Sequence, residues 1–237
     1  MQQSLTPNDG VIIFDTETTG FDNAEVIEAA WIVVDHPTSL SFVDGYHERF
    51  KPSKRIELGA LSTHHILEDE LQECRPSSEF KLPNGLGYMI GHNVDFDWKV
   101  AGEPDVKRIC TLALSRWLWP DIDAHNQTAM MYFLCSDHKW VRDAVKNAHS
   151  ALHDVRNCQV VLSNIIYEIQ TREGPDADPL TWDRLWEISE VARIPTKMAF
   201  GKHKGEKIED IPYNYVSWLL RQPDLDPYLE KALRARK

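Results

Sequence analysis

Two carboxylates follow a run of apolar residues near the start of this 237-residue chain. Residues 11–14 (Val-Ile-Ile-Phe) predict a strand that is buried on both faces, and Asp15 and Glu17 come directly after it. Side chains two residues apart on an extended backbone point to the same side. Two carboxylates placed in this way repel each other unless a cation lies between them. The spacing therefore predicts a site for a hard cation, and the alternative is an acidic strand end that only faces water.

A third carboxylate follows a second predicted strand. Residues 88–91 form a short apolar run, and Asn93 after it is a suitable helix N-cap. Asp97 then lies about one turn into the helix, with its side chain directed back toward the strand end. Open α/β sheets place their sites beyond the carboxyl ends of strands. We expect Asp97 to join the first two acids and Asp95 to face solvent.

A fourth carboxylate and a histidine accompany a long helix near the middle of the chain. Ser150 is its expected N-cap, and Asp154 flanks the apolar stripe of a helix that continues to about Thr171. His149 precedes the helix and is free to orient, whereas His153 is expected to point outward. A histidine titrates near neutral pH, so His149 is suited to accept a proton from water.

Together these residues provide the groups needed for two-metal phosphodiester hydrolysis. In such sites two cations about 3.5–4 Å apart bind the attacking and the leaving oxygen. Oxygen ligands favour Mg²⁺ or Mn²⁺ over zinc. The chain has no Cys-x-x-Cys pair, which argues against a structural zinc site or a redox motif.

The elements that must position these groups predict an α/β fold. An antiparallel meander is expected from the first strand, Glu25–Asp35 and Gly45–Lys51. Glu28, within the second of these strands, is interpreted as a partner for a backbone or cationic group. The remaining expected elements are helices over 56–72, 111–119, 126–135 and 150–171 and a short strand over 106–110. His64, in the first of these helices, is a candidate phosphate contact, and a solvated helix-surface histidine is the alternative.

Composition and charge indicate two parts. The net charge is −11, but residues 193–237 carry ten Lys or Arg against six Asp or Glu, which leaves 16 against 31 before them. Turn-forming residues at 174–179 predict a linker. We therefore expect a catalytic domain over 9–172, a linker over 173–181 and a small basic module over 182–237.

The basic module has two interpretations. Three lysines cluster in a predicted glycine-flanked hairpin and could contact phosphates: Lys202, Lys204 and Lys207. The alternative is a cap that packs on the catalytic part. The chain has no stretch with the apolar length of a membrane span and no signal pattern at Met1–Asn8, so a cytoplasmic location without membrane contact is expected.

The three motifs, taken in order, resemble those of the DEDDh 3′–5′ exonuclease family. They are Asp15-Thr16-Glu17-Thr18-Thr19-Gly20, His92-Asn93 with Phe96-Asp97, and His149-x-Ala151-x-x-Asp154. The tract 110–120 and the tail with Phe200-Gly201-Lys202 are similar to the exodeoxyribonuclease X group of that family.

The resemblance implies a ribonuclease H-like mixed sheet flanked by helices, and it implies roles for individual residues. Asp15, Glu17, Asp97 and Asp154 would bind two Mg²⁺ or Mn²⁺ ions, with Asp15 bridging both, and His149 would be the general base. The substrate 3′ end would lie against Thr18, Thr19 and Gly20, with further substrate contacts from His64 and Asn93.

The resulting hypothesis is an exonuclease that releases nucleoside 5′-monophosphates from the 3′ end of single-stranded or frayed DNA. An exoribonuclease of the same superfamily is the rival, because the motifs do not specify contacts to the 2′-hydroxyl. An adaptor that binds nucleic acid without catalysis is disfavoured, because all four acids and the base are present.

Overall fold

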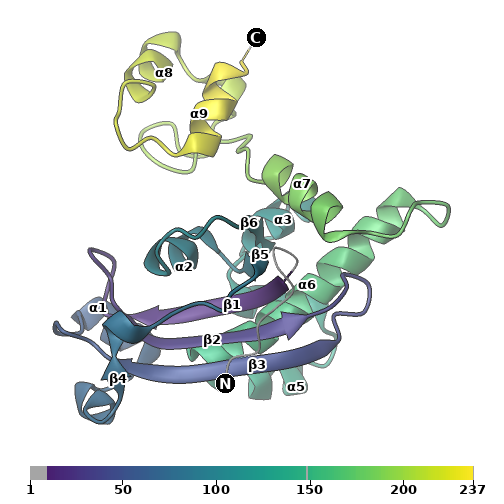
Figure 1. The fold of residues 1–237 in the computed structure, drawn as a ribbon. Coiled ribbons are helices and arrows are strands. Elements are labelled where there is room, and N and C mark those ends of the chain that lie inside the picture. Colours follow the sequence, from purple (N-terminus) through teal and green to yellow (C-terminus); the bar gives the residue numbers. More distant parts are fainter. Residues whose placement is uncertain (1–9, 148, 237) are drawn as a thin grey trace. The chain divides into compact units, whose positions relative to one another are not determined.

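A mixed six-stranded sheet organises the N-terminal part of the computed structural model, which describes residues 10–147 and 149–236 (Figure 1). The strands lie in the order β4-β3-β2-β1-β5-β6. β1 is antiparallel to β2 and parallel to β5, which is parallel to β6. The strand bounds are β1 Gly10–Thr18, β2 Val26–Val34, β3 Phe42–Lys51, β4 Arg75–Pro76, β5 Leu86–Gly91 and β6 Lys107–Cys110. The predicted α/β class and the antiparallel meander of the first three strands are confirmed.

The two faces of this meander differ in character. Phe14, Trp31 and Tyr46 are cross-strand partners, and Trp31 stacks on Tyr46 with ring centroids 3.9 Å apart. Asp15 is one residue further along β1, so it belongs to the opposite face. The cross-strand partner of Asp15 is Ala30, whose small side chain leaves room around the carboxylate. Both faces form core, because Val11 and Ile13 on the side of Asp15 are also buried, and that second face carries the acids where β1 ends.

Helices cover the face that carries the acids. α6 (Ala151–Glu173) runs along β1 and β2, and α3 (Thr111–Leu118) and α4 (Gln127–Leu134) pack on α6 (Figure 1). The apolar stripe of α6 is buried because it faces the sheet. α2 (Asp95–Val100) contacts β1.

Two helical predictions need correction. The segment 56–72 is not one helix: α1 (Leu58–His64) ends at His65, which has a left-handed backbone with φ 57°. A separate 3-10 turn, η1 (Glu68–Leu71), follows. α5 (His138–Ala144) was not predicted, because only its Val141 is fully buried and it has no long apolar stripe.

The boundary between the two compact units lies between Ser189 and Glu190, later than the predicted linker. α7 (Trp182–Ala192) begins in the first unit, where the Trp182 indole donates to the carbonyl of Asp35 at 3.0 Å. The Ser189 hydroxyl accepts the Cys110 N–H at 2.9 Å. These bonds attach the start of the expected C-terminal module to the sheet domain.

The C-terminal unit has its own small core. η4 (Ile208–Asp210), α8 (Tyr213–Leu219) and α9 (Pro227–Arg234) surround it. Its buried side chains are Met198, Ile208, Ile211, Val216, Leu219, Leu229, Ala232 and Leu233. The predicted hairpin is reduced to backbone bonds such as Gly205 N–H to the Met198 carbonyl, and to one bridge between Lys197 and Lys207. No helix in the described ranges is both long and apolar enough to cross a membrane.

Candidate active site

The end of β1 places two carboxylates on the face that packs against α6. Asp15 is half-buried, and Glu17 is only 9% exposed. Their alternation with the buried Phe14 and Thr16 fixes their side, because neighbouring residues on a strand point to opposite faces. The arrangement of these two acids agrees with the expectation from their spacing.

Asp97 is attached to the residue between those two acids. Its Oδ1 accepts the N–H of Thr16 at 3.0 Å and the Thr16 hydroxyl at 2.7 Å. Neither bond uses Oδ2. Asp97 is buried in the first turn of α2, as predicted, but Val94 rather than Asn93 is the N-cap residue. Asn93 is exposed in a left-handed turn with φ 78°.

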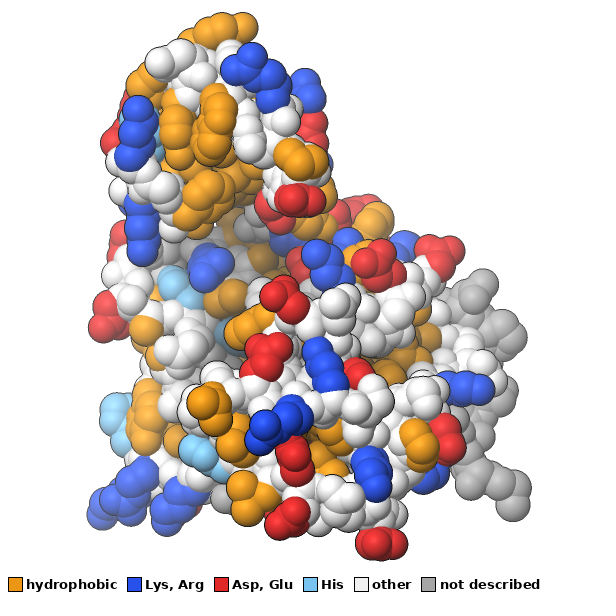
Figure 2. Space-filling view, turned by 90° about the vertical axis from the view of Figure 1, so that its left-hand side faces the viewer, with side chains coloured by type: hydrophobic (Ala, Val, Ile, Leu, Met, Phe, Trp, Pro, Cys, Tyr) orange, Lys and Arg blue, Asp and Glu red, His pale blue; other side chains and the backbone are white. Residues whose placement is uncertain are grey.

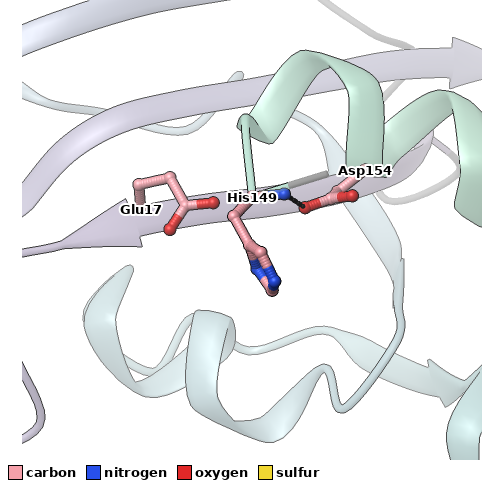
Figure 3. Close-up of side chains that lie close together, drawn as sticks. All are labelled: Glu17, His149 and Asp154. Atoms are coloured by element: carbon pink, nitrogen blue, oxygen red, sulfur yellow. Dashed lines mark hydrogen bonds between the residues drawn. The ribbon is translucent and has the colours of Figure 1, made fainter. Parts of the chain in front are cut away.

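The third motif meets the first at the start of α6. Glu17, His149 and Asp154 each offer a ligand atom, and these atoms lie within 4.8 Å of one another (Figure 3). The His149 N–H donates to Asp154 Oδ2 at 2.9 Å. This bond uses the main chain of His149, which has φ 66°, so the exposed imidazole remains available for another role.

The electrostatics indicate a cation site. Burial raises the pKa of Asp15 well above its usual range, and repulsion from Asp97, Asp154 and Glu17 adds to the shift. Burial, followed by repulsion from Asp154, raises the pKa of Glu17 to about 8. Burial also raises the pKa of Asp97 to about 7 and that of Asp154 above its usual value. The four acids are therefore so close that ionisation of one disfavours ionisation of the others. A bound divalent cation would offset this repulsion.

Glu28 borders this cluster but has partners of its own. It is the cross-strand neighbour of Glu17 and is fully buried. Its Oε1 accepts Arg49 Nε at 2.9 Å, and its Oε2 accepts the Ala151 N–H at 2.8 Å. Burial acts to raise the pKa of Glu28, but its hydrogen bonds outweigh that effect and leave the pKa below its usual value. The predicted role as a partner for backbone and cation is confirmed.

The turn after β1 lies beside the acids, and its threonine side chains form hydrogen bonds within the turn. The Thr18 hydroxyl donates to the Gly20 carbonyl at 2.8 Å, and the Thr19 hydroxyl accepts the Glu25 N–H at 3.0 Å. Gly20 has φ 155°, a backbone conformation that other residues rarely adopt, so the turn favours glycine at this position. The predicted contacts of Thr18, Thr19 and Gly20 with substrate stay predictions.

His64 is neither solvated nor on a helix surface. It is 7% exposed, and its Nδ1 accepts the Ile66 N–H at 3.0 Å. Burial lowers its pKa, which favours the neutral ring. The Thr18 backbone acts in the opposite direction on that pKa, so His64 lies beside the turn after β1. Its predicted contact with substrate is not tested by these bonds.

Two neighbours of the motifs differ from expectation. Asp95 pairs with Arg108, whose guanidinium lies 4.0 Å from the centroid of the Trp98 ring. The pair attaches α2 to β6, so Asp95 does not simply face solvent. His153 is half-buried rather than outward-facing.

Phe21 is an exposed aromatic residue directly after the first motif, and the motifs did not indicate a role for it. It follows Gly20, is 81% exposed, and meets the ring of Phe96 edge-on with centroids 5.7 Å apart. Phe96 precedes Asp97 in the chain. The signal for Phe21 in the sequence was weak, because a single aromatic residue in a turn has no periodicity.

The three lysines predicted to contact phosphate belong to the C-terminal unit and differ in their surroundings. All three are exposed. Lys207 pairs with Glu209 at 3.2 Å, and Lys202 lies over the ring of Tyr215. Their contact with phosphate stays a prediction.

Known proteins are similar to this chain in sequence. Exodeoxyribonuclease 10 of Escherichia coli (strain K12) is 27% identical over 228 residues, which cover 94% of this chain and 96% of that protein. A family model described as "Putative quorum-sensing-regulated virulence factor" matches residues 187–224 alone.

Solved structures share the fold. Exonuclease X in complex with 5′ overhanging duplex DNA has a TM-score of 0.57 at 23% identity, covering 76% of this chain and 99% of that one. The zinc-bound complex of E. coli ExoI with single-stranded DNA has a TM-score of 0.53 at 18% identity, covering 79% and 43%. The sequence similarity along nearly the whole chain, the fold and the three motifs together support a place in the DEDDh 3′–5′ exonuclease family, close to exonuclease X.

Proposed function

We propose that this chain is a metal-dependent exonuclease that hydrolyses DNA from the 3′ end and releases nucleoside 5′-monophosphates. One observation carries the proposal: three separate segments bring four acids and His149 to one end of β1, and burial and mutual repulsion raise the pKa values of those acids. A protein that only bound nucleic acid would gain nothing from this costly concentration of negative charge.

The donor set fits divalent cations. Asp15, Glu17, Asp97 and Asp154 would hold two Mg²⁺ or Mn²⁺ ions, with Asp15 shared, because hard cations prefer carboxylate oxygens. When bound, the ions supply charge neutralisation at the phosphate and a lower pKa for the attacking water. The chain contributes a prearranged set of acids, because Thr16 already orients Asp97.

His149 supplies the general base in this proposal. Its main chain bonds to Asp154, while its exposed ring is free to meet a water molecule beside the acids. A base must lie within hydrogen-bond reach of the proton that it takes. The position of the ring next to Glu17 and Asp154 supports this role (Figure 3).

Substrate selection would begin at the turn after β1. The exposed Phe21 and the half-buried Phe96 offer an apolar surface beside the acids, on which an unpaired terminal base can stack. This arrangement favours a single-stranded or frayed 3′ end, because the bases of an intact duplex are already stacked. The ExoI structure holds single-stranded DNA, which supports the same class of substrate, whereas the exonuclease X structure holds duplex DNA with a 5′ overhang, whose 3′ end is recessed.

The test uses matched DNA and RNA oligomers with a 5′ label and Mg²⁺. The proposal predicts a ladder that shortens from the 3′ end, nucleoside 5′-monophosphates as products, and faster loss of DNA than RNA. Faster loss of RNA would favour the exoribonuclease. Binding without cleavage in either Mg²⁺ or Mn²⁺ would instead favour a non-catalytic adaptor.

A further inference from the structure

The C-terminal unit carries a cluster of aromatic rings on α8 and the loop before it. Tyr215 and Trp218 are one helical turn apart, with ring centroids separated by 5.4 Å. The His203 ring meets Tyr215 at 4.6 Å. Trp218 is 47% exposed, whereas Val216 and Leu219 of the same helix are buried in the core of the unit. α8 thus completes its core packing and still presents an indole ring to solvent.

A lysine lies against this cluster. The Nζ of Lys202 is 5.4 Å from the centroid of the Tyr215 ring, within the range of a cation–π contact. Gly201 allows the approach: it has φ 70°, and a Cβ there would lie 2.6 Å from the Tyr215 hydroxyl. Within residues 10–147 and 149–236, Lys202 forms no ion pair, whereas Lys207 is paired with Glu209. The ammonium of Lys202 is therefore available to an anion.

The charge of this unit suits a polyanionic ligand. From Glu190 onward there are ten Lys or Arg against seven Asp or Glu, whereas the residues before it have 16 against 30. Figure 2 views the unit from the side on which α8 is drawn in Figure 1, and there hydrophobic side chains gather with Lys and Arg near them. Exposed aromatic rings with adjacent cations are the usual surface for unpaired nucleic acid.

We propose that Lys202, Tyr215 and Trp218 form a second binding site, which takes single-stranded DNA. Bases would stack on the exposed Trp218 ring beside the half-buried Tyr215, and the Lys202 ammonium would contact the phosphate backbone. The choice of ligand rests on the proposed function, which it deepens by assigning part of the substrate other than the reacting 3′ end to a separate site. An intact duplex hides its base faces, so this site selects unpaired strands.

The test measures binding of a labelled oligo(dT) of about 20 nucleotides by fluorescence anisotropy in the full chain. EDTA prevents hydrolysis during the measurement. Trp218→Ala is expected to weaken binding roughly 5- to 100-fold, the range for loss of one base–aromatic stack, with the salt dependence unchanged. Lys202→Ala is expected to weaken binding and to make the slope of log affinity against log salt shallower by about 0.7, the value for one phosphate contact on a single strand.

Matched controls separate this site from general effects. Trp117→Ala removes an indole of similar exposure (45%) from α3 of the first unit, and Lys231→Ala makes the same charge change on α9. Both are expected to bind like the parent. Trp218→Phe keeps a ring and is expected to restore most of the affinity. Melting temperatures establish that each variant is folded, and if the Trp218 variants do not fold, the comparison of Lys202→Ala with Lys231→Ala decides.

Three results would overturn the proposal: unchanged binding by Trp218→Ala and Lys202→Ala, an equal loss with Lys231→Ala, or an equally large loss on blunt duplex DNA. A failure of the proposed function would give a different result from a failure of this second site, because the parent protein would then cleave no DNA with Mg²⁺. The binding comparison in EDTA does not depend on that outcome.

Discussion

Asp97 accepts two hydrogen bonds at one oxygen from Thr16, a residue 81 positions earlier in the chain. Thr16 lies between Asp15 and Glu17, so the two bonds fix the third acid relative to the first two. These bonds lie within the protein chain, so the acids are already held together before a cation binds. Such prearrangement reduces the cost of organising the site when metal and substrate bind.

Stability without metal should fall as the pH rises. Burial and repulsion raise the pKa of Glu17 from 4.5 to about 8 and that of Asp97 to about 7. A carboxyl group whose pKa is higher in the folded state holds its proton more tightly when folded, so its contribution to stability is lost as the pH rises through the folded pKa. The melting temperature in EDTA should therefore decrease as the pH rises to about 8, including the interval from about pH 7 to pH 8, and should level off above it.

Millimolar Mg²⁺ should remove most of that decrease, because the cation replaces the lost protons and binds only the folded chain. The buried His92 does not contribute to the change of stability in this pH range. Burial lowers its pKa to about 4, and a histidine in the unfolded chain is already largely neutral above about pH 7. A melting temperature that is flat with pH in EDTA, or unaffected by Mg²⁺ at pH 9, would contradict the assignment of these acids.

His149→Ala should lose activity by roughly 10²–10⁴-fold, the usual scale for a positioned general base. The shift in melting temperature caused by Mg²⁺ should be largely retained, because four carboxylates remain. His153→Ala is the matched control, since it removes the neighbouring imidazole of the same motif. A larger loss with His153→Ala would show that the third motif is assigned out of register.

Glu28→Ala should destabilise the protein by about 2 kcal/mol, because the buried Ala151 N–H loses its acceptor and Arg49 loses its buried partner, keeping only the exposed Glu70. The kcat should fall as well, since Ala151 begins the helix that carries Asp154. Glu28→Gln keeps an oxygen for the Ala151 N–H and should recover part of both losses. Glu48→Ala, which breaks the exposed pair with Arg75, is the control, and an equal effect from it would contradict an anchoring role for Glu28.

Phe21→Ala should raise KM for single-stranded DNA about tenfold with little change in kcat, because the ring is exposed beside the site and is not one of the acids. Tyr167→Ala on α6 removes another exposed ring (70%) and should change neither constant. Steady-state kinetics on a labelled oligomer measure both. A fall in kcat at constant KM would instead indicate that Phe21 acts in the transition state.

The strands and the acids were predictable because their signals are local. The apolar run of β1, the alternation that puts Asp15 and Glu17 on one side and the stripe of α6 each lie within a few turns or residues. The break at His65 was not predictable, because its left-handed backbone depends on how Ile66 and Leu71 pack beneath it. Helical periodicity continued through that point in the sequence.

Sequence patterns could not predict the hydrogen bonds that connect the motifs. The bonds from Thr16 to Asp97 and from Ala151 to Glu28 join residues 81 and 123 positions apart. The helix-capping pattern indicated Asn93, but the chain turns there with a positive φ and the helix begins two residues later. Such contacts are set by tertiary packing rather than by propensity.

Calorimetric titration of Mn²⁺ into the parent and into Asp15→Asn at about pH 8 measures whether the acids bind two ions and whether Asp15 is needed for both. The substitution keeps the size of the side chain and removes the charge expected to bridge two cations. We expect two ions per parent chain with release of protons and weaker binding of fewer ions by Asp15→Asn. We also expect Asp15→Asn to lose nuclease activity by orders of magnitude while it remains folded. Asp123→Asn, at an exposed acid outside the motifs, should bind and cleave like the parent. Undetectable binding by the parent, or equal binding and turnover by Asp15→Asn, would contradict these expectations.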